Sequence, residues 1–192
     1  MTTPSADGVP AAPGTGGGTR LLIIFILLGA AVAVALGVYG RVHEQSGGAL
    51  FTLGFPSLVW MKVTLATAAM VLAIVQIFTA LRMFGRIGHG PVPRATALTH
   101  RISGVLAVVV SVPVAFHCLW SLGFGTYDTR VLVHSLLGCA FYGLFVTKML
   151  ALRGRRMPGW ALPLLGGALF TAMVVVWLTS AMWFFANGAP DY

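Results

Sequence analysis

The feature that most constrains the fold is a series of five apolar segments, each at least as long as the roughly 20 residues that cross a bilayer as a helix. Hydrophobic residues make up 58% of the 192-residue chain, and charged residues only 8%. Soluble domains are about 25% charged. The sequence therefore predicts an all-α, polytopic protein of the cell membrane, a bundle of five transmembrane helices at residues 21–40, 57–83, 97–122, 130–152 and 160–185.

Composition divides the chain into a membrane domain, residues 20–187, and two tails. Residues 1–19 are rich in Gly, Pro, Ala and Thr without apolar periodicity, which is typical of a disordered tail. Residues 188–192 would form a short tail at the other end. The apolar run after Arg20 exceeds the roughly 7 to 15 residues of a signal-peptide core and lacks a clear cleavage site. We therefore expect it to be the first transmembrane helix.

The distribution of basic residues predicts the orientation in the membrane. Three Lys or Arg flank the predicted helices on one side, at Arg41, Lys62 and Arg130. Nine flank them on the other side, at Arg20, Arg82, Arg86, Arg94, Arg101, Lys148, Arg153, Arg155 and Arg156. Because basic loops stay in the cytoplasm, the amino terminus is predicted inside and the carboxyl terminus outside. The net charge of +8 thus reflects topology, and no nucleic-acid partner is expected.

Two histidines are predicted to lie at the same depth on consecutive antiparallel helices. An imidazole in a membrane segment normally faces the bundle interior and finds a partner there. His117 precedes the outer end of its helix, and His134 follows the outer start of the next, so both lie roughly 6 to 8 Å inside. Neutral imidazoles on facing helices can hold haem iron from both sides. We therefore expect one haem b between the third and fourth helices, with His117 and His134 as iron ligands.

The residues near the two histidines could accommodate a flat and bulky cofactor such as haem. Gly138 lies one turn deeper than His134 on the same face, where the missing side chain leaves space for a porphyrin edge. Pro113 can bend the third helix one turn before its histidine. Gln76, deep in the second helix, is expected to form an interhelical hydrogen bond. Three aromatic residues continue the Gly138 side and could pack against a macrocycle: Phe141, Tyr142 and Phe145.

A third histidine lies too far away to share that haem. His100 precedes His117 by 17 residues, or about 25 Å along a helix. One haem is therefore predicted, although a second, held by His100 with Met149, His89 or another subunit, stays open. Arg101 beside it could be a topology anchor, or its guanidinium could hold a propionate or a quinone carbonyl.

Two short motifs resemble known cytochromes. The segment HRISG, from His100 to Gly104, resembles the His-Arg-x-Ser-Gly motif of the cytochrome b subunits of succinate dehydrogenase. That resemblance implies that His100, Arg101 and Ser103 lie at a quinone site or near haem propionates. His134 with Gly138 is similar to histidine-bearing helices of cytochrome b561-like and ferric-reductase-like domains, although that pattern draws ligands from four helices. Residues 94–156 also resemble an uncharacterised family of actinobacterial integral membrane proteins.

The sequence thus predicts an electron-transfer protein that links the quinone pool to a partner protein on the outer face. Whether it is the cytochrome b subunit of a membrane oxidoreductase stays open. The chain has no Gly-rich phosphate loop, Cys-x-x-Cys, His-Glu-x-x-His or nucleophile elbow. A non-catalytic scaffold with hydrogen-bonded histidines is one alternative. Another alternative is a copper-handling protein, with His117, Cys118, His134 and Cys139 as ligands. This alternative is weaker, because Cys139 lies about 140° around the helix from His134 and the two do not share a face.

Overall fold

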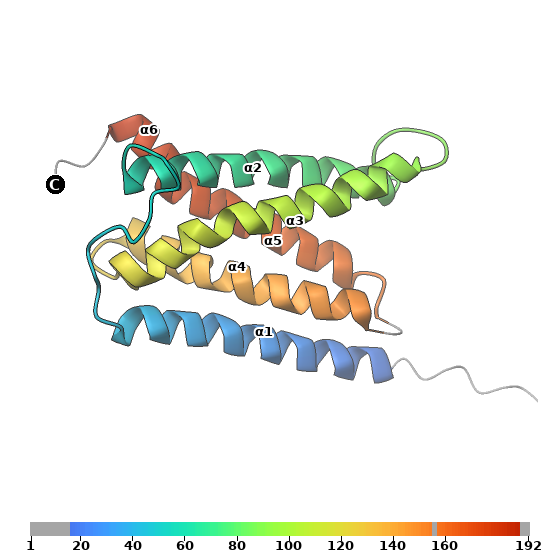
Figure 1. Cartoon of the computed structure of the whole chain (residues 1–192). Helices are drawn as coiled ribbons and strands as arrows, with labels where there is room; N and C mark the ends of the chain where they lie inside the picture. Colours follow the sequence, from blue (N-terminus) through green and yellow to red (C-terminus); the bar gives the residue numbers. More distant parts are fainter. Residues whose placement is uncertain (1–15, 155–156, 189–192) are drawn as a thin grey trace, which may run out of the picture.

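Regular structure in this protein is entirely helical within the residues that its computed structural model describes, 16–154 and 157–188. Five helical stretches are long and apolar enough to cross a membrane. The predicted all-α, five-helix fold is confirmed, and the chain is a multi-pass membrane protein. Its helices are α1 (Gly16–Val42), α2 (Leu58–Met83), α3 (Arg94–His117), α4 (Thr129–Arg153), α5 (Ala161–Trp177) and α6 (Trp183–Asn187), with π-helical turns η1 (Cys118–Leu122) and η2 (Leu178–Met182) following α3 and α5 (Figure 1).

The helix ends differ from the predicted ones by a few residues. α1 begins at Gly16, so residues 16–19 are helical instead of belonging to the predicted tail. α2 begins at Leu58 because the Ser57 hydroxyl caps it, accepting a hydrogen bond from the Trp60 backbone N–H at 3.3 Å. The fifth segment continues through η2 to Asn187. The predicted tails at residues 1–15 and 189–192 lie outside the described residues.

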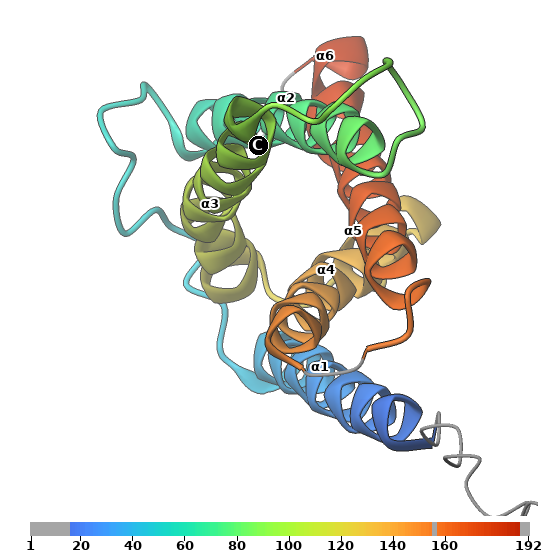
Figure 2. The same cartoon turned by 90° about the vertical axis from the view of Figure 1, so that its right-hand side faces the viewer.

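Four helices form a ring, and α1 lies outside it against α4 (Figure 2). Within the ring, α2 packs against α3 and α5, and α4 packs against α5. The consecutive helices α3 and α4 are not among the closely packed pairs. The described ends of the chain lie at opposite ends of the bundle (Figure 1), as an odd number of spans requires. Which end faces the cytoplasm remains the prediction made from the basic residues.

Two glycines bring α1 and α4 into backbone contact. A Cβ atom on Gly29 would overlap the Gly143 carbonyl oxygen and the Thr147 hydroxyl. A Cβ atom on Gly143 would in turn overlap Gly29 and come 3.0 Å from the Ala33 Cβ. The Thr147 hydroxyl donates to the Phe25 carbonyl across the interface at 3.2 Å. Small residues of this kind allow close helix packing in lipid, where no hydrophobic force holds helices together.

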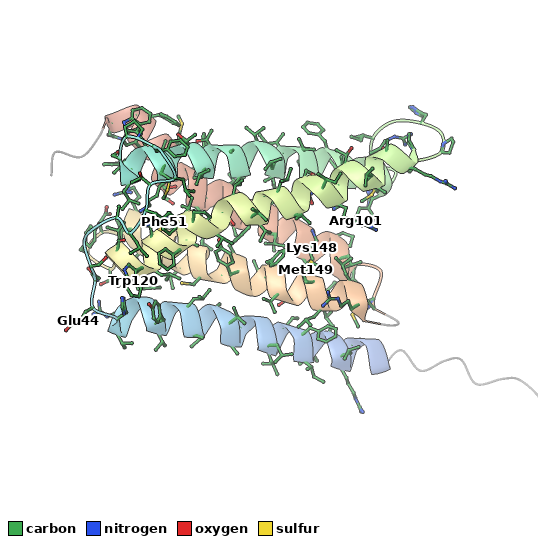
Figure 3. The ribbon with its side chains drawn as sticks, viewed as in Figure 1. Glu44, Phe51, Arg101, Trp120, Lys148 and Met149 are labelled. Carbon is green, nitrogen blue, oxygen red and sulfur yellow. The ribbon has the colours of Figure 1, made fainter. Side chains whose placement is uncertain are left out.

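An apolar cluster fills the middle of the bundle between α2, α4 and α5. Its buried members are Ala69, Ala73, Phe141, Leu169, Ala172 and Met173. Tyr142 and Phe145 pack against them, so all three aromatic residues predicted to face a macrocycle belong to or contact this cluster. Hydrogen bonds of His100 and His134 lie toward opposite ends of the helices. Figure 3 shows the side chains of the bundle, with Arg101 and Lys148 labelled in one half and Phe51 and Trp120 in the other.

Candidate functional site

Two groups of polar side chains lie in layers toward the two ends of the bundle, and the Ser111–Tyr142 pair lies between them. We call Lys62, Cys118, Arg130, His134 and Thr179 the His134 layer, and Gln76, Thr79, His100, Ser103 and Lys148 the His100 layer. On α4, His134, the buried Phe141 and Lys148 recur at intervals of seven residues and thus share one helix face. The 14 residues from His134 to Lys148 separate the layers by about 21 Å along the helix.

His134 is oriented by a threonine of the π-helical turn η2. Its Nδ1 lies 3.2 Å from the Thr179 hydroxyl, which donates its own proton to the Val175 carbonyl at 2.7 Å. A hydroxyl that donates to this carbonyl accepts from Nδ1–H, and in that tautomer the lone pair of the neutral ring is on Nε2. The Cys118 thiol lies within interaction range of the His134 ring and of Lys62.

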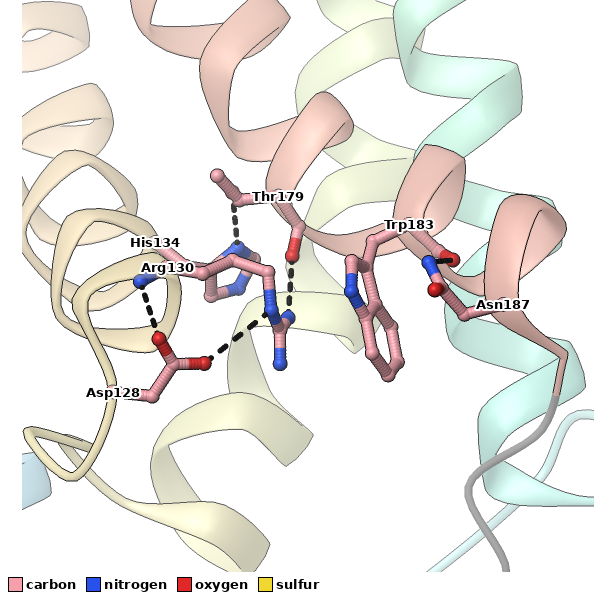
Figure 4. Close-up of polar contacts among 6 residues, drawn as sticks. All are labelled: Asp128, Arg130, His134, Thr179, Trp183 and Asn187. Atoms are coloured by element: carbon pink, nitrogen blue, oxygen red, sulfur yellow. Dashed lines mark hydrogen bonds and ion pairs between the residues drawn. The ribbon is translucent and has the colours of Figure 1, made fainter.

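Arg130 fixes the position of Thr179 (Figure 4). Its Nη1 donates to the Thr179 carbonyl at 2.7 Å, and its guanidinium carbon lies 4.2 Å from the centre of the Trp183 ring. Its Nε also forms an ion pair with Asp128 at 3.6 Å. Because π-helical turns disturb the regular hydrogen bonding of a helix, a cation that takes one of their carbonyls stabilises the turn. Arg130 thus ties α4 to η2 and α6.

His117 is fully buried, with an exposed fraction of 0%, at the end of α3. Its Nδ1 lies 2.9 Å from the Pro113 carbonyl, which can only accept, so Nδ1 carries the proton. Its Nε2 is buried and has no hydrogen-bond partner within the described part of the chain. The Phe51 ring, from the loop between α1 and α2, packs against the imidazole edge with 4.5 Å between centroids. A backbone-anchored Nδ1–H with a free Nε2 is the form that metal-binding histidines usually take.

The two predicted iron ligands have different neighbours. Among the described residues, no hydrogen bond or aromatic contact joins His117 to His134. Consecutive helix residues point about 100° apart, and it is Cys118 that lies beside His134. The structure therefore brings His134 together with Cys118 and Thr179, and places His117 against Phe51 and Phe116.

The other residues predicted around the haem occupy varied surroundings. A Cβ atom on Gly138 would meet nothing within 4 Å, so the space beside it is open. The Tyr142 hydroxyl lies 2.9 Å from that of Ser111 and links α4 to α3. Cys139 faces α1, where its Sγ would lie 3.9 Å from a Cβ on Gly37. Among the residues of the described part of the chain, no group of three or more His, Cys, Asp or Glu could hold a metal ion.

The His100 layer joins α2 to α3. The Gln76 amide donates to the Ser103 hydroxyl at 2.7 Å and also to the His100 carbonyl, which confirms the predicted interhelical hydrogen bond. The His100 Nδ1 lies 2.8 Å from the Thr79 hydroxyl. That hydroxyl donates to the Val75 carbonyl at 2.7 Å, so it accepts from His100. Arg101, the neighbour in the predicted motif, is exposed.

Sequence reasoning missed the two threonines that orient the histidines. Thr79 and Thr179 each donate to the carbonyl four residues earlier and accept from an imidazole of another helix. Their residue type could have indicated this role, because Ser and Thr in membrane helices often form hydrogen bonds between helices. The second and fifth predicted helices carry no histidine, but they supply the partners of histidines on the third and fourth.

Replacing Thr179 by Val is expected to lower the free energy of unfolding by roughly 1 kcal/mol, the upper range for interhelical hydrogen bonds in membranes. Valine keeps the shape of the side chain but leaves His134 Nδ1–H without its acceptor. Ser180→Ala is the matched control, because the Ser180 hydroxyl donates only within its own helix, to Val176. Unfolding curves in mixed micelles measure both variants, and an equal loss for both would contradict the interhelical bond.

Comparison with known families covers almost the entire membrane domain. Residues 22–190 match a family model described as "Family of unknown function (DUF6529)". No curated protein and no solved structure matches the chain. The match includes all five membrane-spanning segments and both polar layers. This match confirms that the chain resembles an uncharacterised family of membrane proteins. The chain belongs to the DUF6529 family, whose function is unknown.

Proposed function

We propose that the protein is a membrane-embedded, b-type cytochrome-like electron carrier that holds one haem b between α3 and α4. The observation that carries the proposal is the state of the two imidazoles. His117 and His134 each use Nδ1–H to bond a protein oxygen, which leaves an Nε2 lone pair for iron. When bound, haem supplies reversible one-electron chemistry at its iron.

The arrangement of α3 and α4 gives further support. These helices are not closely packed, and the space beside Gly138 is open. Ligation by both histidines requires His117 to turn from Phe51 toward α4. His117 is fully buried, so this movement takes its ring out of the contacts with Phe51 and Phe116 and away from the Pro113 carbonyl. Cys118, which now lies beside His134, would then border the porphyrin.

The remaining residues have positioning roles in this proposal. Thr179 would fix which nitrogen of His134 faces the iron, and Arg130 holds Thr179. His100, Arg101 and Ser103 would contact quinone, as the sequence resemblance implies. Because the two layers are about 21 Å apart along α4, quinone would approach the haem by diffusion. A partner protein would exchange electrons at the His134 end.

A second candidate is a non-catalytic scaffold, and one observation favours it. All three histidines in the membrane helices already have protein hydrogen-bond partners on Nδ1. Such bonds stabilise a bundle without any cofactor. In this case His100 and His134 join helices, the His117 bond lies within α3, and the exposed surfaces bind other membrane proteins.

An optical spectrum of the purified protein, expressed with haem supplied, tests the proposal. A cytochrome gives a sharp Soret band and α and β bands that sharpen on reduction, with about one haem per chain by pyridine haemochrome assay. A colourless protein that remains folded and monodisperse would overturn the proposal in favour of the scaffold. Metal analysis of the same sample detects copper, the third alternative.

A further inference from the structure

Lys148 is a cation in the bundle interior with no counter-charge among the residues that the structure describes. It is half-buried and shares the inward face of α4 with the buried Phe141. Its Nζ lies 4.0 Å from the position of a Cβ atom on Gly166 of α5, and His100 of α3 is within electrostatic range. Lys148 therefore projects between three helices, about 7 Å inside the end of α4 at Arg153.

No described residue neutralises this ammonium. Lys148 forms no ion pair, and the ion pair found among the described residues, between Arg130 and Asp128, lies at the other end of α4. The described acidic residues are Glu44 and Asp128. Both lie toward the His134 end of the bundle, about 30 Å from Lys148 along α4 in the case of Asp128. A cation removed from water costs free energy unless an anion accompanies it.

The surroundings of Lys148 are polar and held in place. Thr79 fixes the His100 ring through Nδ1, and this ring lies within electrostatic range of the ammonium. The Gln76 amide holds the His100 backbone and the Ser103 hydroxyl. Opposite, Gly166 has no side chain to fill the space near the ammonium. Figure 3 labels Lys148 in the half of the bundle that also contains Arg101.

From this arrangement we propose that Lys148 binds an oxyanion, a phosphate or carboxylate group carried by an anionic lipid or by a free anion. Three N–H donors on a flexible stem suit a tetrahedral phosphate or a carboxylate without demanding a fixed plane. The site is about 21 Å along α4 from His134, so it does not depend on the proposed haem. If Lys148 binds no anion, the optical test of the proposed haem is unaffected. If the protein binds no haem, the test of the anion site is likewise unaffected.

Thermal unfolding of the full-length protein in a neutral detergent tests the site with defined probes. Delipidated protein is titrated with inorganic phosphate, with phosphatidylglycerol in the micelles, and with phosphatidylcholine as the zwitterionic control. We expect phosphatidylglycerol or phosphate to raise the melting temperature of the wild type, and phosphatidylcholine to have no effect. Lys148→Met and Lys148→Gln should weaken the apparent affinity at least about tenfold, the loss expected for a hydrogen bond to a charged group.

Two further variants make the result specific. Lys148→Arg keeps the charge and should be stabilised by the anion as the wild type is. Arg153→Gln removes an exposed cation five residues away on the same helix, and it should also be stabilised as the wild type is. A response to phosphate identifies a free anion as a sufficient ligand, and a response to phosphatidylglycerol alone identifies a lipid headgroup. The proposal is overturned if neither anion stabilises the wild type, if Lys148→Met and Lys148→Gln respond fully, or if Arg153→Gln loses as much affinity as they do.

Discussion

Replacing His134 by Ala is expected to abolish the haem spectrum of the purified protein. His134, which Thr179 orients, would hold the haem iron through Nε2, and alanine offers no such nitrogen. His117→Ala should have the same effect, because its free Nε2 is the other proposed ligand. His100→Ala should keep most of the spectrum, since His100 lies in the other polar layer. Difference spectra and haem content per chain measure all three variants.

A rescue experiment separates ligation from folding in the histidine variants. An alanine at a true ligand position leaves a cavity in which added imidazole can bind the iron and restore the low-spin spectrum. A structural histidine gives no such recovery. Circular dichroism and gel filtration report whether each variant is folded. If both His117→Ala and His134→Ala kept the spectrum, or only His100→Ala bleached the protein, the assignment of the ligands would be refuted.

The fold could be predicted from the sequence because its physical determinants are local. Segments of some 20 apolar residues must form helices in lipid, where unpaired backbone groups cost several kcal/mol each. The ends were predicted less accurately, because capping decides them: Ser57 moves the start of α2 past Pro56. The packing order was not predictable from length or hydropathy. That α1 lies on α4 follows from the fit of Gly29 to Gly143, a contact between residues far apart in the sequence.

The depth of the site residues could also be predicted, but not the directions in which they point. Depth follows from the rise per residue, whereas direction depends on how each helix is rotated in the bundle. Bonds from Gln76 and Thr79 fix the rotation of α3 at His100. The 18 residues from His100 to Cys118 complete about five turns, so Cys118 shares the direction of His100. His117 is one residue short of that and points about 100° away, toward Phe51.

Replacing Gly143 by Leu is expected to destabilise the protein by about 3 kcal/mol or more, a large overpacking effect. The new side chain would start in contact with the Gly29 backbone and 3.0 Å from the Ala33 Cβ, so α1 must move away from α4. For a chain of this size the melting temperature should fall by roughly 6 to 12 °C. The hydrogen bond from Thr147 to Phe25 would be lost in the same movement.

The same helix supplies a matched control for this effect. Gly138→Ala adds a methyl group where nothing lies within 4 Å, so it should gain up to roughly 1 kcal/mol from helix propensity. Gly143→Ala gains the same stability from helix propensity but loses more stability through the overlap of its methyl group with Gly29. The two alanine variants should therefore shift the melting temperature in opposite directions. Equal stability of Gly143→Ala and Gly138→Ala would mean that α1 does not pack on α4 through these glycines.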